Sequence, residues 1–187
     1  VGSEMCIRDS LYPKGLESPD YGAIINAPQY ERLTAWLEEA RQAGAQIPPC
    51  VTHARDDATR KLVPHLLTEV PGHCQVMQQE IFGPLLPLVP YDDIEEALAY
   101  VAARPRPLAL YLMSLDETLQ RRLIRETHAG GMAINESLFQ VAADDAPFGG
   151  IGPSGMGHYH GREGFLTFSK AKTVLRRGRF STGSLIH

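Results

Sequence analysis

The chain has 187 residues and a formal net charge of −4 at pH 7; 43% of its residues are hydrophobic and 21% are charged. This composition is ordinary for a globular protein with one buried core and unlike that of a disordered chain. The negative charge argues against a nucleic-acid partner, and no apolar run approaches the roughly 20 residues that a membrane helix requires. We therefore expect a cytoplasmic protein without a membrane segment, whose partner is a small molecule or another subunit.

The cysteines and the first residues limit the part of the chain that carries the fold. Cys6, Cys50 and Cys74 are odd in number and irregularly spaced, which argues against a disulfide framework and against a Cys-x-x-Cys motif. Residues 1–10 share no pattern with the rest of the chain, and we interpret them as a non-native leader from processing, cloning or sequence assembly. The fold is expected to begin at Leu11.

The first regular element is an amphipathic helix. Asn26 and Pro28 are helix start signals and Gly44 is a stop signal, so a helix is expected to run to about Ala43. Its apolar residues recur at helical spacing, with charged residues on the opposite face. The apolar set is Leu33, Trp36, Leu37 and Ala40.

Two short apolar pairs come next, at residues 62–63 and 66–67, with Pro64 between them. Proline has no backbone N–H to donate to a sheet, so it marks an edge or an interruption. The pattern predicts a hairpin or two short strands.

From Pro84 onward, strand-like and helix-like segments alternate. Apolar runs at residues 85–89, 108–113 and 132–135 predict three strands, the first of them covered on both faces. Amphipathic helices are expected between them, each opened by residues at capping-box spacing. These capping pairs are Asp92 with Glu95 and Ser114 with Glu117.

This alternation predicts an α/β domain over residues 11–169, with a parallel sheet and helices on its faces. Ligands of such sheets bind beyond the carboxyl ends of the strands. The loops after Val89, Met113 and Asn135 are therefore the first places to look for a site.

A glycine-rich loop occupies residues 146–161 and contains six glycines. Gly150, Gly152 and Gly155 have the spacing of a dinucleotide-binding fingerprint, but no apolar strand immediately precedes them and no convincing βαβ unit comes after them. We favour the interpretation that the glycines let the loop pass close to a substrate or to the sheet.

Two other groups of residues suggest chemistry and are weaker candidates. His158 and His160 form a His-x-His pair, but no third ligand stands at a telling spacing, so we expect no metal site. Cys74 precedes Glu80 by six positions, yet only His73 is adjacent to stabilise a thiolate. We expect a structural thiol.

The segment Glu80-Ile81-Phe82-Gly83-Pro84 places a carboxylate and an aromatic ring beside a tight turn that opens onto a buried strand. Such a pair suits a nicotinamide riboside. The carboxylate can accept hydrogen bonds from two ribose hydroxyls, and the ring can pack against the nicotinamide.

This segment, with Gln79, resembles the E-E-I-F-G-P motif of the aldehyde dehydrogenases. Further segments match that family in the same order, and together they cover nearly all of the chain from Leu11 to about Arg177. These segments are Ser18–Gly22, Val76–Gln78, Pro107–Tyr111, Gly130-Gly131 with Asn135, and Pro147–Gly157. Residues 156–161 are most similar to the class 3 and coniferyl aldehyde dehydrogenase branch, which implies medium-chain or aromatic aldehydes.

The resemblance implies roles for five residues and a cofactor, NAD or NADP. Glu80 would hold the nicotinamide ribose and Phe82 would line the nicotinamide site. Asn135, Phe148 and His160 would lie near the substrate funnel or support its loop.

The family's reaction uses a cysteine thiolate that attacks the aldehyde, hydride transfer to NAD(P), and water activated by a glutamate to hydrolyse the thioester. The resemblance places that nucleophile, the general base and the dinucleotide-binding fold N-terminal to the match at Leu11. The catalytic residues are therefore expected outside this chain, which would be inactive alone as the C-terminal portion of the enzyme.

The resemblance also implies that residues 170–187 form an oligomerisation strand and tail. Residues 172–177 would extend the sheet of a partner subunit, and a homodimer is expected for the full-length enzyme. Two alternatives remain open. One is a non-catalytic interaction module that binds a related subunit through an edge strand near Val174, and the other is a metal-dependent hydrolase that uses His158 and His160.

Overall fold

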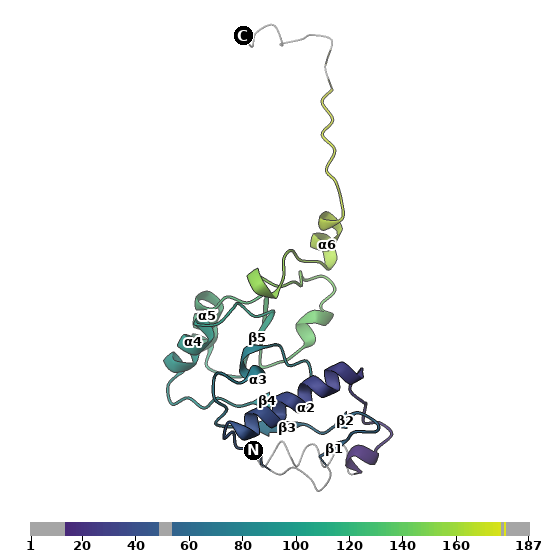
Figure 1. Cartoon of the computed structure of the whole chain (residues 1–187). Helices are drawn as coiled ribbons and strands as arrows, with labels where there is room; N and C mark the ends of the chain where they lie inside the picture. Colours follow the sequence, from purple (N-terminus) through teal and green to yellow (C-terminus); the bar gives the residue numbers. More distant parts are fainter. Residues whose placement is uncertain (1–13, 49–53, 177, 179–187) are drawn as a thin grey trace. The chain divides into compact units, whose positions relative to one another are not determined.

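The computed structural model describes residues 14–48, 54–176 and 178. The chain divides after Pro90 into two compact units, and each contains helices and a parallel pair of strands (Figure 1). The α/β fold class predicted from the sequence is confirmed. Among the described residues no helix has the length and apolar character needed to cross a membrane. The predicted leader, Cys6 and Cys50 lie outside the described residues.

The long helix of the first unit is α2 (Ala27–Gln42). Its start is fixed by Asn26, whose Oδ1 accepts a hydrogen bond of 2.9 Å from the backbone N–H of Gln29, and by Pro28 in the first turn. The predicted helix is confirmed. Its buried side chains recur every three or four residues and so form one face; they are Tyr30, Leu33, Leu37 and Ala40.

Four short strands accompany this helix. β1 (Arg55–Asp56) pairs antiparallel with β2 (Lys61–Leu62), and β3 (His65–Leu67) pairs parallel with β4 (Leu85–Pro87). The predicted short strands around Pro64 are confirmed, but a hairpin between them is wrong, because they belong to different sheets. Two short helical turns complete the unit, η1 (Gly15–Glu17) and α3 (Gln75–Gln78).

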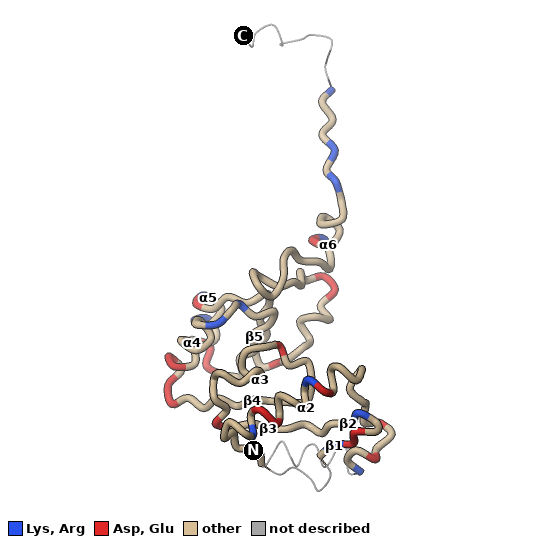
Figure 2. Tube along the Cα trace, viewed as in Figure 1, with Lys and Arg blue, Asp and Glu red and all other residues tan. Residues whose placement is uncertain are grey.

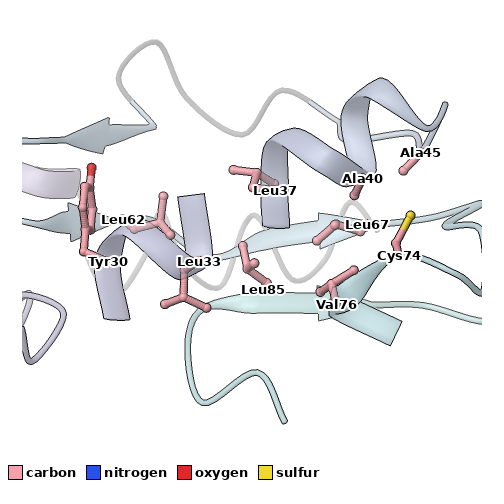
Figure 3. Packing of buried hydrophobic residues seen from close by; sticks show 10 residues of the cluster. All are labelled: Tyr30, Leu33, Leu37, Ala40, Ala45, Leu62, Leu67, Cys74, Val76 and Leu85. Carbon is pink, nitrogen blue, oxygen red and sulfur yellow. The ribbon is translucent and has the colours of Figure 1, made fainter. Parts of the chain in front are cut away.

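The core of the first unit lies between α2, the strands and α3. Figure 3 shows its ten buried side chains, which come from elements spread over residues 30–85. Successive residues of a strand point to opposite faces, and only one face of β4 meets this core. Leu85 is buried and Leu86 is 53% exposed, so the expectation of a strand covered on both faces is wrong for β4.

The second unit contains α4 (Ile94–Ala102), β5 (Ala109–Leu112), α5 (Glu117–Glu126) and β6 (Gly131–Ile134). β5 and β6 pair in parallel over their whole length, with α5 as the connection. These helices and strands were predicted within a few residues of their observed bounds. The expectation that the three strands share one parallel sheet is wrong, because β4 pairs with β3 in a separate sheet.

Both capping boxes predicted for these helices are wrong in position. α4 is capped by Asp93, whose Oδ1 accepts from the backbone N–H of Glu95 at 3.0 Å. α5 is capped by Asp116, whose Oδ1 accepts from the N–H groups of residues 118 and 119. In each case an aspartate nearer to the helix competes with the predicted cap and satisfies the free N–H groups more directly.

An ion-pair network joins α4 to α5. Arg122 lies against Glu95, with Nη2 2.7 Å from Oε2, and its Nε lies 2.8 Å from Oε2 of Glu126. The hydrogen bonds from Arg122 hold the pKa of the Glu95 carboxyl below its usual range. A hollow of about 510 Å³ lies beside this network, and none of the site residues predicted from the sequence lines it.

The remainder of the second unit is mostly loop. It contains η2 (Phe139–Ala142), η3 (Gly152–Ser154) and α6 (Gly161–Thr167), which begins at the end of the glycine-rich loop. Residues 169–176 form no helix or strand. The strand expected at residues 172–177 would need a partner's sheet, and it stays a prediction; residue 177 lies outside the described residues.

We expect Leu33→Ala to lower the free energy of unfolding of the first unit by about 2–5 kcal/mol, because a fully buried side chain is replaced by a cavity. Trp36 is the only tryptophan and lies on the same helix, so urea unfolding followed by its fluorescence reports on this unit. The control is Ile25→Ala at an exposed position, which should change stability by less than about 0.5 kcal/mol. Equal losses in the two variants would contradict this account of the core.

Cys74 is fully buried, and burial, with the nearby Glu39 carboxylate, raises the pKa of its thiol. The thiol therefore stays protonated and unreactive in the folded chain. We expect iodoacetamide at pH 8 to modify Cys74 at least about tenfold more slowly in the native chain than in urea, as measured by peptide mass spectrometry. Rapid modification of the native chain would show that the thiol is accessible and activated.

Candidate cofactor-facing loop and aromatic cluster

The loop that carries Glu80 and Phe82 connects α3 to β4 in the first unit. The Glu80 side chain is exposed, and the Phe82 ring is 81% exposed. Ile81, between them, packs against the core. The loop therefore anchors itself through its middle residue and presents an anionic and a flat apolar group to the outside.

The backbone of this loop is held by two side chains of α2. Gln29 Nε2 donates hydrogen bonds to the carbonyl oxygens of Ile81 at 3.2 Å and Phe82 at 2.9 Å. Arg32 donates from Nη1 to the carbonyl oxygen of Glu80 at 3.0 Å and from Nη2 to that of Ile81 at 2.6 Å. Three successive carbonyls are thus bound by one helix.

The turn after Phe82 packs directly on the core. A Cβ atom at Gly83 would collide with Cδ1 and Cδ2 of Leu33, which is fully buried. A side chain at position 83 would therefore force Leu33 to shift within the core, and glycine avoids this. The position of the loop thus depends on how Leu33, on the buried face of α2, packs in the core.

The chemistry of the Glu80 carboxylate suits a ligand with two hydroxyls. Among the residues that the structure describes, no hydrogen bond or ion pair uses this carboxylate, so both oxygens are available as acceptors. A carboxylate of this kind can accept from two vicinal ribose hydroxyls. The residues present therefore fit the nicotinamide riboside that the sequence suggested.

Asn135, the third predicted residue, comes directly after β6 in the second unit and has a positive φ of 54°. Its Oδ1 accepts from the backbone N–H of Ser114 at 2.8 Å, and its Nδ2 donates to the carbonyl of Ser114 at 2.9 Å. The amide thus binds the loop after β5 to the end of β6. The expected place of Asn135, near the substrate funnel or in support of its loop, stays a prediction.

Phe148 and His160 are brought together by the fold. Phe148 and Tyr159 exchange backbone hydrogen bonds of 2.9 Å across the glycine-rich loop. The His160 ring stacks on Phe148, with centroids 6.0 Å apart and planes at 24°, and meets Tyr159 edge-on at 4.5 Å. Phe148, Tyr159 and His160 form an aromatic cluster, and Tyr159 was not predicted as a member.

The glycine-rich loop packs closely against the start of β6. A Cβ atom at Gly130 would collide with the carbonyl oxygens of Gly149 and Leu108, so the loop passes against the sheet. The loop's own glycines pack on the loop itself, since a Cβ atom at Gly149 would collide with the carbonyl oxygen of Gly157. A close approach of the loop to the sheet agrees with the interpretation of its glycines, and a close approach to a substrate stays a prediction. Gly150 and Gly155 flank only the short turn η3, and the dinucleotide fingerprint does not apply.

The two histidines of the glycine-rich loop serve different contacts. Nε2 of His158 lies 3.2 Å from Oε2 of Glu163, whereas His160 lies in the aromatic cluster. Within the described ranges, 14–48, 54–176 and 178, no group of three or more His, Cys, Asp or Glu side chains could hold a metal ion. These contacts do not favour the hydrolase alternative.

Gln29 and Arg32 were missed by sequence reasoning. They stand three positions apart in the first turns of α2, so they share a face of the helix. A polar pair at this spacing beside a buried face is the one signal that could have drawn attention to them. Their partners are backbone carbonyls about 50 positions away, which no side-chain pattern reveals.

Comparison with known proteins gives a consistent family assignment. The model of the aldehyde dehydrogenase family matches residues 12–174. A probable coniferyl aldehyde dehydrogenase of Pseudomonas aeruginosa is 52% identical over 181 residues, which are 97% of this chain and 37% of that protein.

Solved structures agree. The substrate-bound AldH of Staphylococcus aureus has a TM-score of 0.84 and 40% identity, covering 96% of this chain and 38% of that one. An aldehyde dehydrogenase of Mycobacterium tuberculosis complexed with NAD+ has a TM-score of 0.74 and 27% identity, covering 86% and 33%. This chain therefore spans between 33% and 38% of the length of these relatives. The resemblance found in the sequence motifs, including the coniferyl aldehyde dehydrogenase branch, is confirmed: the chain belongs to the aldehyde dehydrogenase family.

Proposed function

We propose that this chain forms the nicotinamide-facing and substrate-facing part of an NAD(P)-dependent aldehyde dehydrogenase that oxidises aromatic or medium-chain aldehydes to carboxylic acids. The observation that supports this most is the loop at residues 80–82. Its carbonyls are tied to α2, while the Glu80 carboxylate and the Phe82 ring are left exposed. Bound NAD(P)+ would supply the hydride acceptor.

The roles of the chain's own residues derive from their chemistry. Glu80 accepts hydrogen bonds from the ribose hydroxyls and so fixes the sugar. Phe82 offers a flat apolar surface for the nicotinamide. Neither residue transfers a proton or an electron; each orients the cofactor, and orientation is a large part of catalysis in hydride transfer.

The aromatic cluster supports the proposed substrate class. Phe148 and His160 stack with planes inclined by 24°. Flat rings of this kind bind an aromatic or extended apolar group by stacking and apolar contact. Asn135 holds the loops at the ends of β5 and β6, and we assign it a supporting role for these loops.

The nucleophile of the reaction is proposed to come from outside the matched residues. Cys74 is unsuited to the role because it is fully buried and its thiol pKa is raised. The relatives are nearly three times as long as the matched region, which leaves ample polypeptide for a thiolate and a general base. We propose the thioester route implied by the family for the complete enzyme, and no turnover by this chain alone.

We also propose that the complete enzyme is a homodimer. Val174 and Leu175 are 76% and 95% exposed, and basic residues flank them along the C-terminal segment (Figure 2). An apolar pair in a segment that has no strand partner among the described residues is suited to pairing with the sheet edge of a second subunit. The same observation would also suit a non-catalytic interaction module, which a measurement of activity distinguishes from an enzyme.

The proposal is tested by a chimera in which residues 12–174 replace the matching segment of the Pseudomonas aeruginosa relative. We expect the chimera to form NADH or NADPH, followed at 340 nm, with an aromatic aldehyde, and the isolated chain to form none. A folded chimera without activity would contradict the proposal. Activity of the isolated chain that is abolished by Cys74→Ala would show that the nucleophile has been misplaced.

In the same chimera, Glu80→Gln tests the cofactor contact. Loss of the charge weakens charge-assisted hydrogen bonds to the ribose, so kcat/KM for NAD(P)+ should fall by about ten- to a hundredfold. Glu31→Gln is the matched control, because Glu31 is an exposed carboxylate on the outer face of α2. If both substitutions leave kcat/KM for the cofactor unchanged, Glu80 is not a cofactor contact.

A further inference from the structure

We infer that Gln29 and Arg32 are positioning residues that set the conformation of the loop at residues 80–82 and thereby the affinity for the nicotinamide cofactor. The inference rests on the proposed function of Glu80 and Phe82. It adds two residues of α2 that do not need to touch the cofactor themselves to affect its binding.

Gln29 and Arg32 form one hydrogen-bonded network, and their contacts fix the orientation of the Gln29 amide and of the Arg32 guanidinium. Nε of Arg32 donates to Oε1 of Gln29 at 3.0 Å, which turns the Gln29 amide so that its nitrogen faces the loop. The Arg32 guanidinium lies 4.1 Å from the ring centroid of Trp36, and this contact holds its plane. The donors therefore reach the loop in a fixed arrangement.

The loop conformation requires such support. Phe82 has a φ of +46°, a left-handed conformation that is unfavourable for a residue with a bulky side chain. A conformation of this kind persists only where the surroundings enforce it. Here the carbonyl before Phe82, that of Ile81, accepts a hydrogen bond from Arg32, and the carbonyl of Phe82 itself accepts one from Gln29.

The consequence is a defined direction for the two exposed side chains. Because the carbonyls of residues 80–82 all bind α2, the Glu80 side chain and the Phe82 ring are left on the exposed side of the loop. Without the two donors, Phe82 can relax to a negative φ, and its ring and the adjacent carboxylate would be redirected. Loss of the network should weaken the cofactor site without removing either contacting residue.

The first test uses the 187-residue chain labelled with ¹³C and ¹⁵N. The variants are Gln29→Leu and Arg32→Met, which remove the donors and keep much of the apolar volume. We expect the Cα and Cβ chemical shifts of Phe82, which depend on φ, to move away from left-handed values. Gln42→Leu and Arg41→Met are matched controls on the same helix, since their side chains bind Glu38, and should leave these shifts unchanged.

The second test measures kinetics in the chimera with residues 12–174. Arg32→Met should raise KM for NAD(P)+ about tenfold and change KM for the aldehyde less than twofold, and Arg32→Lys should recover part of the loss. Combined with Glu80→Gln, its effect should be less than multiplicative, because both act through one contact. A purely structural role would instead lower thermal stability without this division between the two KM values.

The outcomes separate the positioning role from the function on which it rests. Unchanged Phe82 shifts, or an unchanged cofactor KM in Arg32→Met while Glu80→Gln is impaired, would overturn the positioning role alone. If Glu80→Gln leaves the cofactor kinetics unchanged, the proposed function fails, and the effect of α2 on cofactor affinity fails with it. Shifted Phe82 signals together with a selective rise in cofactor KM support both.

Discussion

The packing of α2 on the parallel pair β3 and β4 is the interaction on which the cofactor-facing loop depends. Leu33 takes part in this packing, fully buried and close to the turn at Gly83. The same helix carries Gln29 and Arg32 on its first turns, so the position of the helix determines where their donors lie. Burial of its apolar face fixes the position of α2, and α2 then holds the backbone of residues 80–82 through side-chain hydrogen bonds.

The second unit orders its loops by polar and aromatic contacts in place of a large apolar core. Asn135 binds Ser114 at the ends of the two parallel strands, where ligands of α/β sheets commonly bind. Phe148 and His160 are joined through the backbone pairing of the glycine-rich loop. In both units, side chains proposed to face ligands are placed by hydrogen bonds to the backbone of their own loop.

The sequence predicted the elements whose signal is local. The helix at Asn26, the strands of both parallel pairs and the two amphipathic helices of the second unit can be derived from spacing and capping chemistry. The caps shifted to Asp93 and Asp116 because two competing acceptors stand within two residues of each other. The helix α6 was not predicted, since glycines at its first and fourth positions lower helix propensity.

The sequence predicts those residues of the candidate site whose side chains belong to a recognisable motif, but not the residues that contact only the backbone. Glu80 and Phe82 stand in a recognisable motif, whereas the positive φ of Phe82 and its support by Arg32 arise only when segments about 50 residues apart meet. Gln29 and Arg32 contact main-chain oxygens, which every residue type supplies. Their role therefore leaves no trace in the pattern of the loop sequence.

The dependence of the loop on α2 limits how parts of this chain can be exchanged with relatives. Residues 79–84 moved alone into another scaffold would carry the phenylalanine but not the donors that hold it in a left-handed conformation. Leu33 would also have to leave room for the turn at Gly83. For recombination or design, the helix and the loop behave as one inseparable segment, although the sequence places them far apart.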